Sequence, residues 1–475
     1  MFERRVEVKN VVESLLKKTV GSRRYAEEAA ATHVDKSSIA FGATSETKFL
    51  SYPFVIESAK GARVRDIDGN EYIDILQGLG ANLFGHGPDF VRAAVAEQME
   101  KGFPLGAQTP LVREVAELIT ELTGMPKVCF SNTGTEAIMT AIRVARAKTG
   151  RSKIVIFSDA YHGHVDWVIM RQPLAEFARR RLVEKWRHGR LSAISRFLGK
   201  RAVKGAAPAS VGIPSSIAKD VIVLPYGSEK SLKVIRSLRS KLAAVLVEPV
   251  QSRRPELQPR EFLRVLREIT CEGNVGLIFD EMVTGFRIHP GGAQAYFGVE
   301  ADLVTYSKIA GGGLPLSVLA GRNDFMSYLA PMAGGGRDKT VFFAGTFCKH
   351  PLSIAASHAV MSKLKEEGPK LQEGLNQRSA LMVKKLNDNL KEEGIPVSFT
   401  NFGSFFSIAL SESDLTPDDV NYLSCYLQDC GIYLRSGDKG GFLTTAHSDA
   451  DVKAISKAFL DGLRLIFDNK NSLKK

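Results

Sequence analysis

Short, almost continuously apolar runs alternate along this chain with longer stretches whose apolar residues recur at helical spacing. One of the longer stretches, EAIMTAIRVARAKTG at 136–150, ends at a glycine, as helices often do. Apolar strands between helices are typical of a mostly parallel sheet that helices cover on both faces. In such sheets ligands bind at the carboxyl ends of the strands. The strand candidates are residues 127–132, 153–159, 221–226, 242–250, 276–282 and 303–308.

The two ends of the chain show a different pattern. DIDGN at 66–70 lies between two short β-rich runs and predicts a hairpin turn. After about residue 347 the pattern becomes helix-rich and then mixed, which indicates a smaller α+β domain. We therefore predict three parts: an N-terminal segment, 1–95, that contributes to the small domain, a large domain at 96–346, and a C-terminal small domain at 347–475.

The composition is that of an ordinary globular protein. The chain has 475 residues, of which 44% are hydrophobic and 24% are charged, enough for two or three domains. No apolar run approaches the roughly 20 residues of a membrane span, and the charged start MFERRVEVKN does not resemble a signal peptide. Five dispersed cysteines without a CxxC pair indicate a reducing compartment. We expect a cytoplasmic protein that does not span a membrane.

The positive charge is concentrated in one segment. Residues 171–204 hold eight Arg and three Lys against two Glu, a net of +9 in a chain whose total is +12. Leu191, Ile194, Phe197 and Leu198 lie at helical spacing, so part of the segment could form an amphipathic helix. The segment could be a solvated helical hairpin, a docking face for an acidic partner, or a contact for an anionic membrane. No recognised nucleic-acid-binding module accompanies it, so we expect no nucleic-acid partner.

The first candidate site follows the strand at 127–132. Thr133, Gly134 and Thr135 lead directly into the next predicted helix. A helix N-terminus offers unpaired N–H groups and a partial positive charge, and glycine lets a ligand approach the backbone closely. The stretch could therefore cradle a phosphate group. The alternative is an ordinary helix N-cap.

The second candidate site is YHGH, residues 161–164, which follows the strand at 153–159. Tyr161 could stack on a flat ring, or it could be a partly buried loop tyrosine. The pair His162 and His164 raises the question of a metal site, but no third ligand stands at a recognisable spacing. We therefore predict no metal ion.

Two further candidates are an acid and a lysine at strand ends. Asp280 follows the apolar run GLIF, where a carboxylate beneath a cofactor could hold a pyridinium nitrogen. Lys308 follows another apolar strand and precedes Gly311–Gly313, a setting that suits a Schiff-base lysine better than a lysine that reaches to solvent. A phosphate cradle, a stacking aromatic, an acid and such a lysine are together what pyridoxal phosphate requires. The ring is an electron sink only while its nitrogen is protonated, which Asp280 would enforce.

The order of these motifs resembles that of the class III aminotransferases, pyridoxal-phosphate enzymes of fold type I. The resemblance covers about residues 50–470 and rests on SNTGTEA, YHG, VEPV, FDEMVTGFR, YSKIAGGGLP and AGTF. Residues 279–315 are similar to glutamate-1-semialdehyde aminomutase. Residues 247–263 and 342–352 are more similar to the aminotransferase domains of polyketide and nonribosomal peptide synthases. The resemblance implies an α/β fold: a large cofactor-binding domain with a mostly parallel seven-stranded sheet, plus a smaller α+β domain.

The resemblance also implies roles for single residues. Lys308 forms the Schiff base and carries the proton, while Asp280 pairs with the ring nitrogen. Tyr161 and Met282 cover opposite faces of the ring. Thr346 matches a threonine that reaches the phosphate of the partner subunit, which implies an obligate homodimer with shared sites. The implied catalytic residues are Lys308, Asp280 and Tyr161, and the implied cofactor-binding residues are Thr133, Gly134, Thr135, Tyr161, His162, Glu248, Asp280, Met282, Lys308 and Thr346.

The chain departs from the aminomutase pattern in two places. The aminomutases have an N-terminal arginine for the substrate carboxylate, and the matching position here falls near Thr44–Ser45, without an arginine. An acceptor whose carboxylate is masked as a thioester would not need that arginine. Arg253 stands where the aminomutases have a neutral amide. It could meet the phenolic oxygen of the cofactor or a substrate group, or it could point to solvent.

These observations predict a ping-pong aminotransferase of natural-product biosynthesis. An amino acid such as glutamate or glutamine would donate the amino group, and a ketone or aldehyde of a polyketide or fatty-acyl intermediate would accept it. An acyl carrier protein docked on residues 171–204 would hold the acceptor. The alternatives are a glutamate-1-semialdehyde-type aminomutase and a small-molecule omega-transaminase. A third is a cofactor-fold protein that binds a partner without catalysis, against which Lys308 and Asp280 argue.

Overall fold

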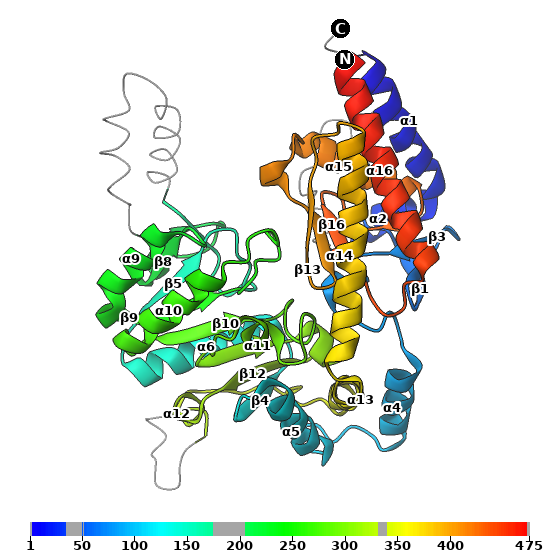
Figure 1. Ribbon diagram of the computed structural model, residues 1–475. Coiled ribbons are helices and arrows are strands. Elements are labelled where there is room, and N and C mark those ends of the chain that lie inside the picture. The colour runs from blue at the N-terminus through cyan, green and yellow to red at the C-terminus, as the bar shows by residue number, and fades with distance from the viewer. Residues whose placement is uncertain (1, 35–49, 51, 174–204, 331–339, 473–475) are drawn as a thin grey trace, which may run out of the picture. The chain divides into compact units, whose positions relative to one another are not determined.

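The computed structural model (Figure 1) describes residues 2–34, 50, 52–173, 205–330 and 340–472. The positions Thr44–Ser45 and most of the basic segment, with its predicted amphipathic helix, lie outside the described residues. The chain divides into two units. The first combines residues 1–100 with 366–475, and the second is formed by residues 101–365.

The second unit is built on a seven-stranded sheet with the order β4-β12-β11-β10-β9-β5-β8. Strands β11, β10, β9, β5 and β8 are parallel to one another, whereas β12 is antiparallel to both of its neighbours. The strands are β4 Lys127–Ser131, β5 Lys153–Phe157, β8 Val221–Leu224, β9 Leu242–Val247, β10 Gly276–Asp280, β11 Leu303–Tyr306 and β12 Ser317–Gly321. A separate two-stranded ribbon consists of β6 Met170–Arg171 and β7 Ala207–Pro208.

The sequence predicted this sheet except for one strand. The six strand candidates are all present, and the mostly parallel arrangement is confirmed. Strand β12 was not predicted, and its five residues SVLAG are all buried. A short apolar run without alternation does not distinguish a strand from a buried helical turn.

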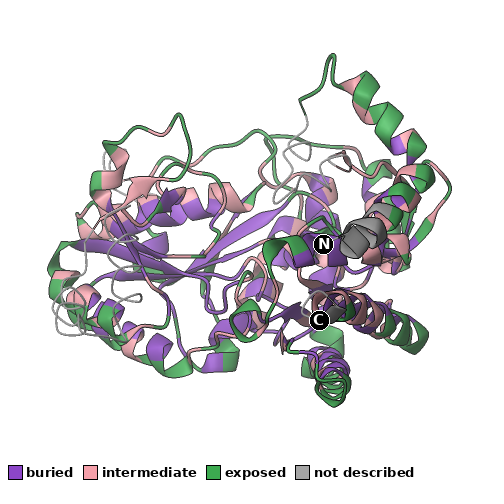
Figure 2. Cartoon of the chain, turned by 90° about the horizontal axis from the view of Figure 1, so that it is seen from above, coloured by how far each residue is buried: buried purple, intermediate pink, exposed green. Residues whose placement is uncertain are grey.

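Helices surround the large sheet and leave its strands buried, as the purple strands in Figure 2 show. Helix α6 packs on the sheet through small and branched side chains such as Ala141 and Ile142, which are fully buried. The helices of this unit are α5 Leu111–Thr123, α6 Gly134–Thr149, α9 Glu229–Leu238, α10 Arg260–Gly273, α11 Gly292–Phe297, α12 Asn323–Met326 and most of α13 Pro351–Glu367. The short 3₁₀ helices are η3 Ile217–Asp220, η4 Arg239–Lys241 and η5 Lys308–Gly311.

The first unit contains two small sheets. The predicted hairpin is confirmed as β2 and β3, and Asp66 in its turn accepts the backbone N–H of Asn70 at 2.8 Å. Strand β15 pairs with β3, so residues from both ends of the chain share one sheet. The four-stranded sheet consists of β1 Ile56–Lys60, β2 Arg63–Asp66, β3 Glu71–Asp74 and β15 Ile432–Tyr433. The three-stranded sheet consists of β13 Phe399–Phe402, β14 Phe405–Ile408 and β16 Gly440–Phe442.

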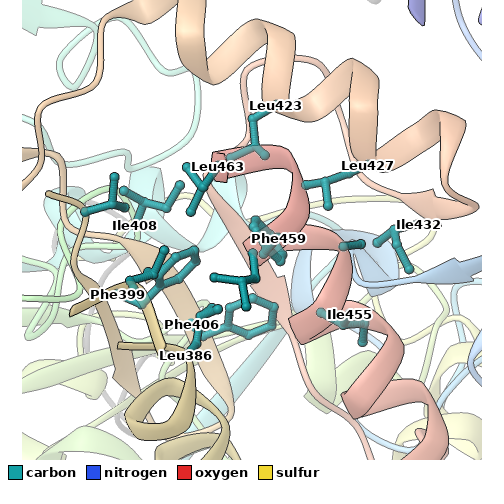
Figure 3. Packing of buried hydrophobic residues seen from close by; sticks show 14 of the residues in the cluster. Leu386, Phe399, Phe406, Ile408, Leu423, Leu427, Ile432, Ile455, Phe459 and Leu463 are labelled. Atoms are coloured by element: carbon teal, nitrogen blue, oxygen red, sulfur yellow. The ribbon is translucent and has the colours of Figure 1, made fainter. Parts of the chain in front are cut away.

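An apolar core holds the first unit together. Phe459 meets Phe399 edge to face with 5.3 Å between the ring centroids, and Figure 3 shows both rings among leucines and isoleucines. The helices of this unit are α1 Phe2–Lys18, α2 Val20–Ala29, α3 Gln77–Gly80, α4 Asp89–Glu100, α14 Pro369–Glu392, α15 Pro417–Asp429 and α16 Asp449–Ser472, with the 3₁₀ helix η7 Leu410–Glu412. Among the described residues, no helix combines the length and the apolar character that a membrane span requires.

Candidate active site

The carboxyl ends of three neighbouring strands bring the predicted acids and the lysine together. Phe279 of β10 pairs with Val247 of β9, and Asp280 pairs with Thr305 of β11. Because these strands are parallel, the residues that follow them emerge at the same edge of the sheet. Glu248, Asp280 and Lys308 stand at or just after the ends of β9, β10 and β11, so they gather there.

Asp280 is buried and held by two partners. Its Oδ2 lies 2.7 Å from Nδ1 of His162, which is also buried. Its Oδ1 accepts the backbone N–H of Met282 at 3.1 Å. Nε2 of His162 is buried and has no hydrogen-bond partner among the described residues. The carboxylate therefore has a fixed orientation, and the histidine behind it has an unsatisfied ring nitrogen.

Glu248 joins two of the strand-end loops. Its Oε2 accepts the backbone N–H of Tyr161 at 2.9 Å, and its Oε1 accepts that of Ser252 at 3.2 Å. Burial raises the pKa of Glu248, an effect that His162 opposes and Asp280 reinforces. The side chain of Tyr161 is 56% exposed, so the ring can meet a ligand.

Lys308 begins the 3₁₀ helix η5 in an unusual environment. Its φ is +45°, a left-handed conformation that costs energy in a residue other than glycine. Burial lowers the pKa of Lys308, although the nearby carboxylates of Asp280 and Glu248 raise it; the charge of Arg287 lowers it further. The neutral amine is thus more populated than in an ordinary lysine.

The predicted phosphate cradle is the start of α6. Thr133 is the N-cap, and its side chain accepts the backbone N–H of Glu136 at 3.3 Å. A Cβ on Gly134 would lie 2.9 Å from Sδ of Met282, so any larger residue there would require the Met282 side chain to move. Oγ1 of Thr135 accepts the backbone N–H of His164 at 3.2 Å.

The loop of YHGH needs its glycine for the same close packing. Gly163 has φ +82°, and a Cβ on it would collide with Oγ1 of Thr135. The contacts of His164 with Thr135 and of Met282 with Gly134 therefore bring three of the motifs, SNTGTEA, YHGH and FDEM, against one another.

Two predicted site residues lie at the edge of this cluster. Thr346 is exposed in the loop that precedes α13, and Sγ of Cys348 in the same loop accepts an N–H of Asn132, the residue before Thr133, at 3.8 Å. Arg253 is exposed, and its guanidinium carbon lies 5.9 Å from the ring centroid of Tyr161. In the described ranges, no group of His, Cys, Asp and Glu side chains has the arrangement of a metal site.

No role was predicted for Glu281, although it stands next to Asp280. Its carboxyl group is buried and accepts the backbone N–H groups of Ala293 at 2.5 Å and Gln294 at 2.9 Å and the hydroxyl of Thr284 at 3.0 Å. Burial raises the pKa of Glu281 to about 7. The acid fixes the loop that follows β10. The sequence feature that could have predicted this role is the position of Glu281 directly after Asp280. Successive side chains at a strand end point in opposite directions, so the two acids face different surroundings.

Arg287 was also missed, and it is nearly as buried as Glu281. Its Nε donates to the backbone carbonyl of Val283 at 3.1 Å, and burial lowers its pKa to about 9. A buried arginine contributes positive potential to the site, and its charge acts on the amine of Lys308. No feature of the sequence indicated that the side chain of Arg287 is buried.

The residues at this edge fit a phosphorylated pyridine aldehyde. The start of α6 offers N–H groups for an anion, and Gly134 allows a close approach. Asp280 and His162 form a buried pair with an unsatisfied ring nitrogen, and Lys308 has an amine with a lowered pKa. This fold and this site define a pyridoxal-phosphate-dependent enzyme.

Comparison with known proteins places the enzyme in a family. The chain belongs to the class III aminotransferases, because the model of the family Aminotransferase class-III matches residues 44–171 and 202–448. The α/β fold is that of the fold type I enzymes, and the predicted family, fold and cofactor are confirmed. The match omits residues 172–201, which are most of the basic segment.

The chain is similar to relatives along nearly its whole length. It is 33% identical over 427 residues to glutamate-1-semialdehyde 2,1-aminomutase of Methanococcoides burtonii, covering 87% of this chain and 93% of that protein. An omega-transaminase from Sphaerobacter thermophilus has a TM-score of 0.80 at 27% identity, with 93% of this chain and 97% of that chain covered. A solved transaminase with pyridoxal phosphate bound also has a TM-score of 0.80, at 26% identity, with 95% and 99% covered.

Proposed function

We propose that the protein is an aminotransferase that moves an amino group between two molecules. The donor is an amino acid such as glutamate or glutamine. The acceptor is the ketone or aldehyde of a polyketide or fatty-acyl intermediate held by an acyl carrier protein. The observation that most supports amino transfer is Lys308, whose amine has a lowered pKa beside the buried carboxylates of Asp280 and Glu248.

The strand-end residues would hold the cofactor. When bound, pyridoxal phosphate supplies an electron sink for the substrate carbon that loses a proton. Thr133, Gly134 and Thr135 would bind the phosphate at the start of α6. Asp280, oriented by His162, would keep the ring nitrogen protonated.

The remaining residues would act on the ring faces and on protons. Tyr161 and Met282 would cover the two faces of the ring. Lys308 would attack a carbonyl carbon as the neutral amine and would then take up and release protons, since both tasks require an amine of lowered pKa. Glu248 would position Tyr161 through its backbone N–H.

Two features of the sequence support a carrier-bound acceptor. No arginine stands at Thr44–Ser45, where the aminomutase pattern has its clamp for a free carboxylate. Residues 171–204 carry a net charge of +9, and most of them fall outside the family match. Carrier proteins generally present an acidic helix, and complementary charge mainly increases the rate of association.

The surroundings of Thr346 support a homodimer with shared sites. Phe342 is 78% exposed and Phe347 is 56% exposed in the same loop. Exposed aromatic residues close together in the chain are typical of a surface that a partner covers. In the homodimer, Thr346 would contribute to the phosphate site of the partner subunit.

A second candidate function is that of a 2,1-aminomutase. The similarity to the protein of that name in Methanococcoides burtonii favours it. An aminomutase returns the amino group to the same molecule, whereas the proposed enzyme passes it to another.

An isotope experiment distinguishes the two candidates. The enzyme is incubated with ¹⁵N-labelled glutamate or glutamine and with keto or aldehyde acceptors, free and carrier-bound, and in a separate reaction with glutamate 1-semialdehyde, and the products are analysed by mass spectrometry. Label in an acceptor supports the proposed function. Isomerisation of glutamate 1-semialdehyde with no label transferred to any acceptor would establish the aminomutase instead.

The carrier part of the proposal has its own test. Neutralising Arg179, Arg180 and Arg181 should raise the KM for a carrier-bound acceptor several-fold, because charge attraction over about 8–10 Å is lost. The KM for the matched free acceptor is the control and should not change. Added salt should reproduce the effect in the parent enzyme. Equal changes with both acceptors would contradict docking at this segment.

A further inference from the structure

Two buried serines face each other across strands β4 and β12. Ser131 and Ser317 are opposite residues of this antiparallel pair, and both are buried. Their hydroxyl oxygens lie 2.8 Å apart. The hydroxyl of Ser317 also donates to the backbone carbonyl of Thr133 at 2.7 Å. Because a buried hydroxyl costs free energy unless it is hydrogen-bonded, these bonds compensate the burial of the pair.

The direction of the hydrogen bond between the serines follows from the number of protons. A hydroxyl has one proton, and that of Ser317 is donated to Thr133. In the contact between the two serines, Ser131 is therefore the donor and Ser317 the acceptor. The result is a directed chain of hydrogen bonds that ends on the carbonyl oxygen of Thr133. Hydrogen bonds in such a chain polarise and strengthen one another.

The carbonyl that ends this chain belongs to the first peptide group of α6. Thr133 is the N-cap, and its carbonyl also accepts the backbone N–H of Ala137 at 3.2 Å. The same peptide group carries the N–H of Gly134, which points opposite to the carbonyl because the peptide is planar and trans. Two hydrogen bonds on the oxygen thus fix the direction of this N–H. The first N–H groups of a helix have no carbonyl of a preceding turn to bind, so this one is offered to an anion.

The start of β12 also reaches the residue before the reactive lysine. The hydroxyl of Ser307 donates to the carbonyl of Leu316, the residue before Ser317, at 2.6 Å. Strand β12 is antiparallel to both β11 and β4, so its first residues lie beside the carboxyl ends of these two strands. Two consecutive residues at the start of β12 therefore hold the backbone on both sides: the N-cap of α6 and the residue before Lys308.

We infer that Ser317, supported by Ser131, is a positioning residue for the phosphate group of the cofactor. It acts through the carbonyl of Thr133 and directs the N–H of Gly134 toward the anion. The inference rests on the proposed function in one respect, namely that the start of α6 binds the phosphate. A serine pair that only joined two strands would contribute to the stability of the sheet and would not distinguish a phosphorylated ligand from an unphosphorylated one.

Binding of the cofactor with and without its phosphate group tests the inference. Pyridoxal phosphate and pyridoxal are titrated into the cofactor-free enzyme and followed by absorbance. Ser317→Ala should raise the dissociation constant of pyridoxal phosphate about three- to tenfold and leave that of pyridoxal within about twofold, because one neutral hydrogen bond to the cradle is lost. Ser131→Ala should have a smaller effect, since the bond from Ser317 to Thr133 remains. Ser131→Ala added to Ser317→Ala should change the affinity little further, because both residues act through one chain.

Ser231→Ala is the matched control. Ser231 is buried in the same unit, and its hydroxyl donates to the carbonyl of Pro225 at 2.6 Å. This variant should lower the thermal midpoint of the cofactor-free protein about as much as Ser317→Ala, while the affinities for both ligands stay within about twofold of the parent.

Two results would overturn the inference. Unchanged affinity for pyridoxal phosphate in Ser317→Ala would show that the serine does not position the cradle. Equal losses for pyridoxal phosphate and pyridoxal would indicate that it supports the fold alone. A failure of the proposed cradle would already be visible in the parent, which would then bind the two ligands equally well.

Discussion

The core of the first unit and the strand ends of the second unit are filled by opposite kinds of side chain. Around Phe459 the first unit packs aromatic and aliphatic residues from α14, α15, α16 and its small sheets (Figure 3). At the strand ends of the second unit the buried side chains include Asp280, His162, Glu248 and Glu281. Burial of apolar surface stabilises a fold, whereas burial of charge costs free energy unless partners compensate it.

The strand ends show this cost in two ways. Burial shifts the pKa of Glu248 upward and that of Lys308 downward, so both charged forms are disfavoured there. Three residues other than glycine also have positive φ in these loops: Asp159 at +69°, Phe286 at +60° and Lys308 at +45°. Strain and buried charge gather where groups must meet a ligand and react. Substitutions there should change the chemistry, whereas substitutions in the apolar core should change stability.

The largest expected effect is that of Lys308→Ala. We expect a loss of turnover by several orders of magnitude, because the proposed nucleophile and proton carrier would disappear together. Stability should not fall, since a buried amine that is costly to charge is removed. Steady-state kinetics and thermal unfolding of the cofactor-free protein check the two statements, and turnover near that of the parent would contradict the assignment.

The difference in stability between Lys308→Ala and the parent should also depend on pH. Because the pKa of Lys308 is lower in the folded protein than the usual value of 10.5, the unfolded chain binds more protons in the interval between the two. Stability of the parent therefore rises with pH through this interval. The advantage of Lys308→Ala should be greatest at lower pH and should shrink as pH rises; a constant difference would contradict the shift.

Asp280→Asn should have the next largest effect. The amide keeps the shape and can still accept a hydrogen bond from His162, but it removes the charge that we propose holds the ring nitrogen protonated. We expect kcat to fall by about a hundred- to ten-thousandfold, with cofactor still bound through the start of α6. Absorbance of the bound cofactor and kcat are measured together. Full activity would show that the carboxylate has another task.

Phe459→Ala tests the apolar core of the first unit. Removing a buried ring should lower the free energy of unfolding by about 3–5 kcal/mol. Activity per folded molecule should stay close to that of the parent at low temperature. Phe459→Leu keeps most of the apolar volume and serves as the milder control. A loss of kcat in the leucine variant without a loss of stability would break the distinction between the two regions.

The sequence predicted the parts of the fold that depend on local patterns. Apolar runs identified six strands of the large sheet, and DIDGN identified the hairpin of β2 and β3. Strand β12 was not predicted, because its five residues carry no alternation and their burial depends on neighbours distant in the chain. Helices α1 and α2 were also not predicted, since charged residues interrupt their apolar faces.

The candidate site was predictable to a similar extent. The strand-end positions of Asp280 and Lys308 and the helix start at Gly134 were visible in the sequence, because a strand end and a glycine are local signals. The double hydrogen bond of Glu248 and the burial of Arg287 were not visible. Contacts between loops far apart in the sequence follow from the packing of the sheet, which no short pattern encodes.

Glu281→Gln should have an intermediate effect on stability. The carboxyl group accepts two backbone N–H groups and one hydroxyl, and an amide offers a single oxygen, so a donor is left unpaired at a cost of about 1–3 kcal/mol. Activity should fall much less than in Asp280→Asn, because the carboxyl group of Glu281 is occupied by the loop that follows β10. Thermal midpoints and kcat are compared for the two neighbouring variants.

The pH dependence of Glu281→Gln sharpens this prediction. Burial raises the pKa of Glu281 from 4.5 to about 7, so the folded parent binds a proton that the unfolded chain has lost between these values. The contribution of Glu281 to stability therefore decreases as pH rises from about 4.5 to about 7. The parent should exceed the variant in stability by more at low pH than at pH 8, and parallel profiles would show that Glu281 does not titrate in this range.

The smallest expected effects compare two threonine N-caps, one in each unit. Thr416 is the N-cap of α15. Its side chain accepts the backbone N–H of Asp419 at 3.2 Å, and the carboxylate of Asp419 accepts the backbone N–H of Thr416 at 2.8 Å. Thr416→Ala should cost about 1 kcal/mol of stability and leave cofactor affinity unchanged. Thr133 caps α6 by a similar bond of 3.3 Å, so Thr133→Ala should cost no more than this. If α6 is the phosphate cradle, however, Thr133→Ala should also raise the cofactor dissociation constant several-fold.

Two measurements separate the effect on stability from the effect on cofactor affinity: unfolding of the cofactor-free proteins and titration with pyridoxal phosphate. Unchanged cofactor affinity in both variants would show that Thr133, like Thr416, only caps its helix.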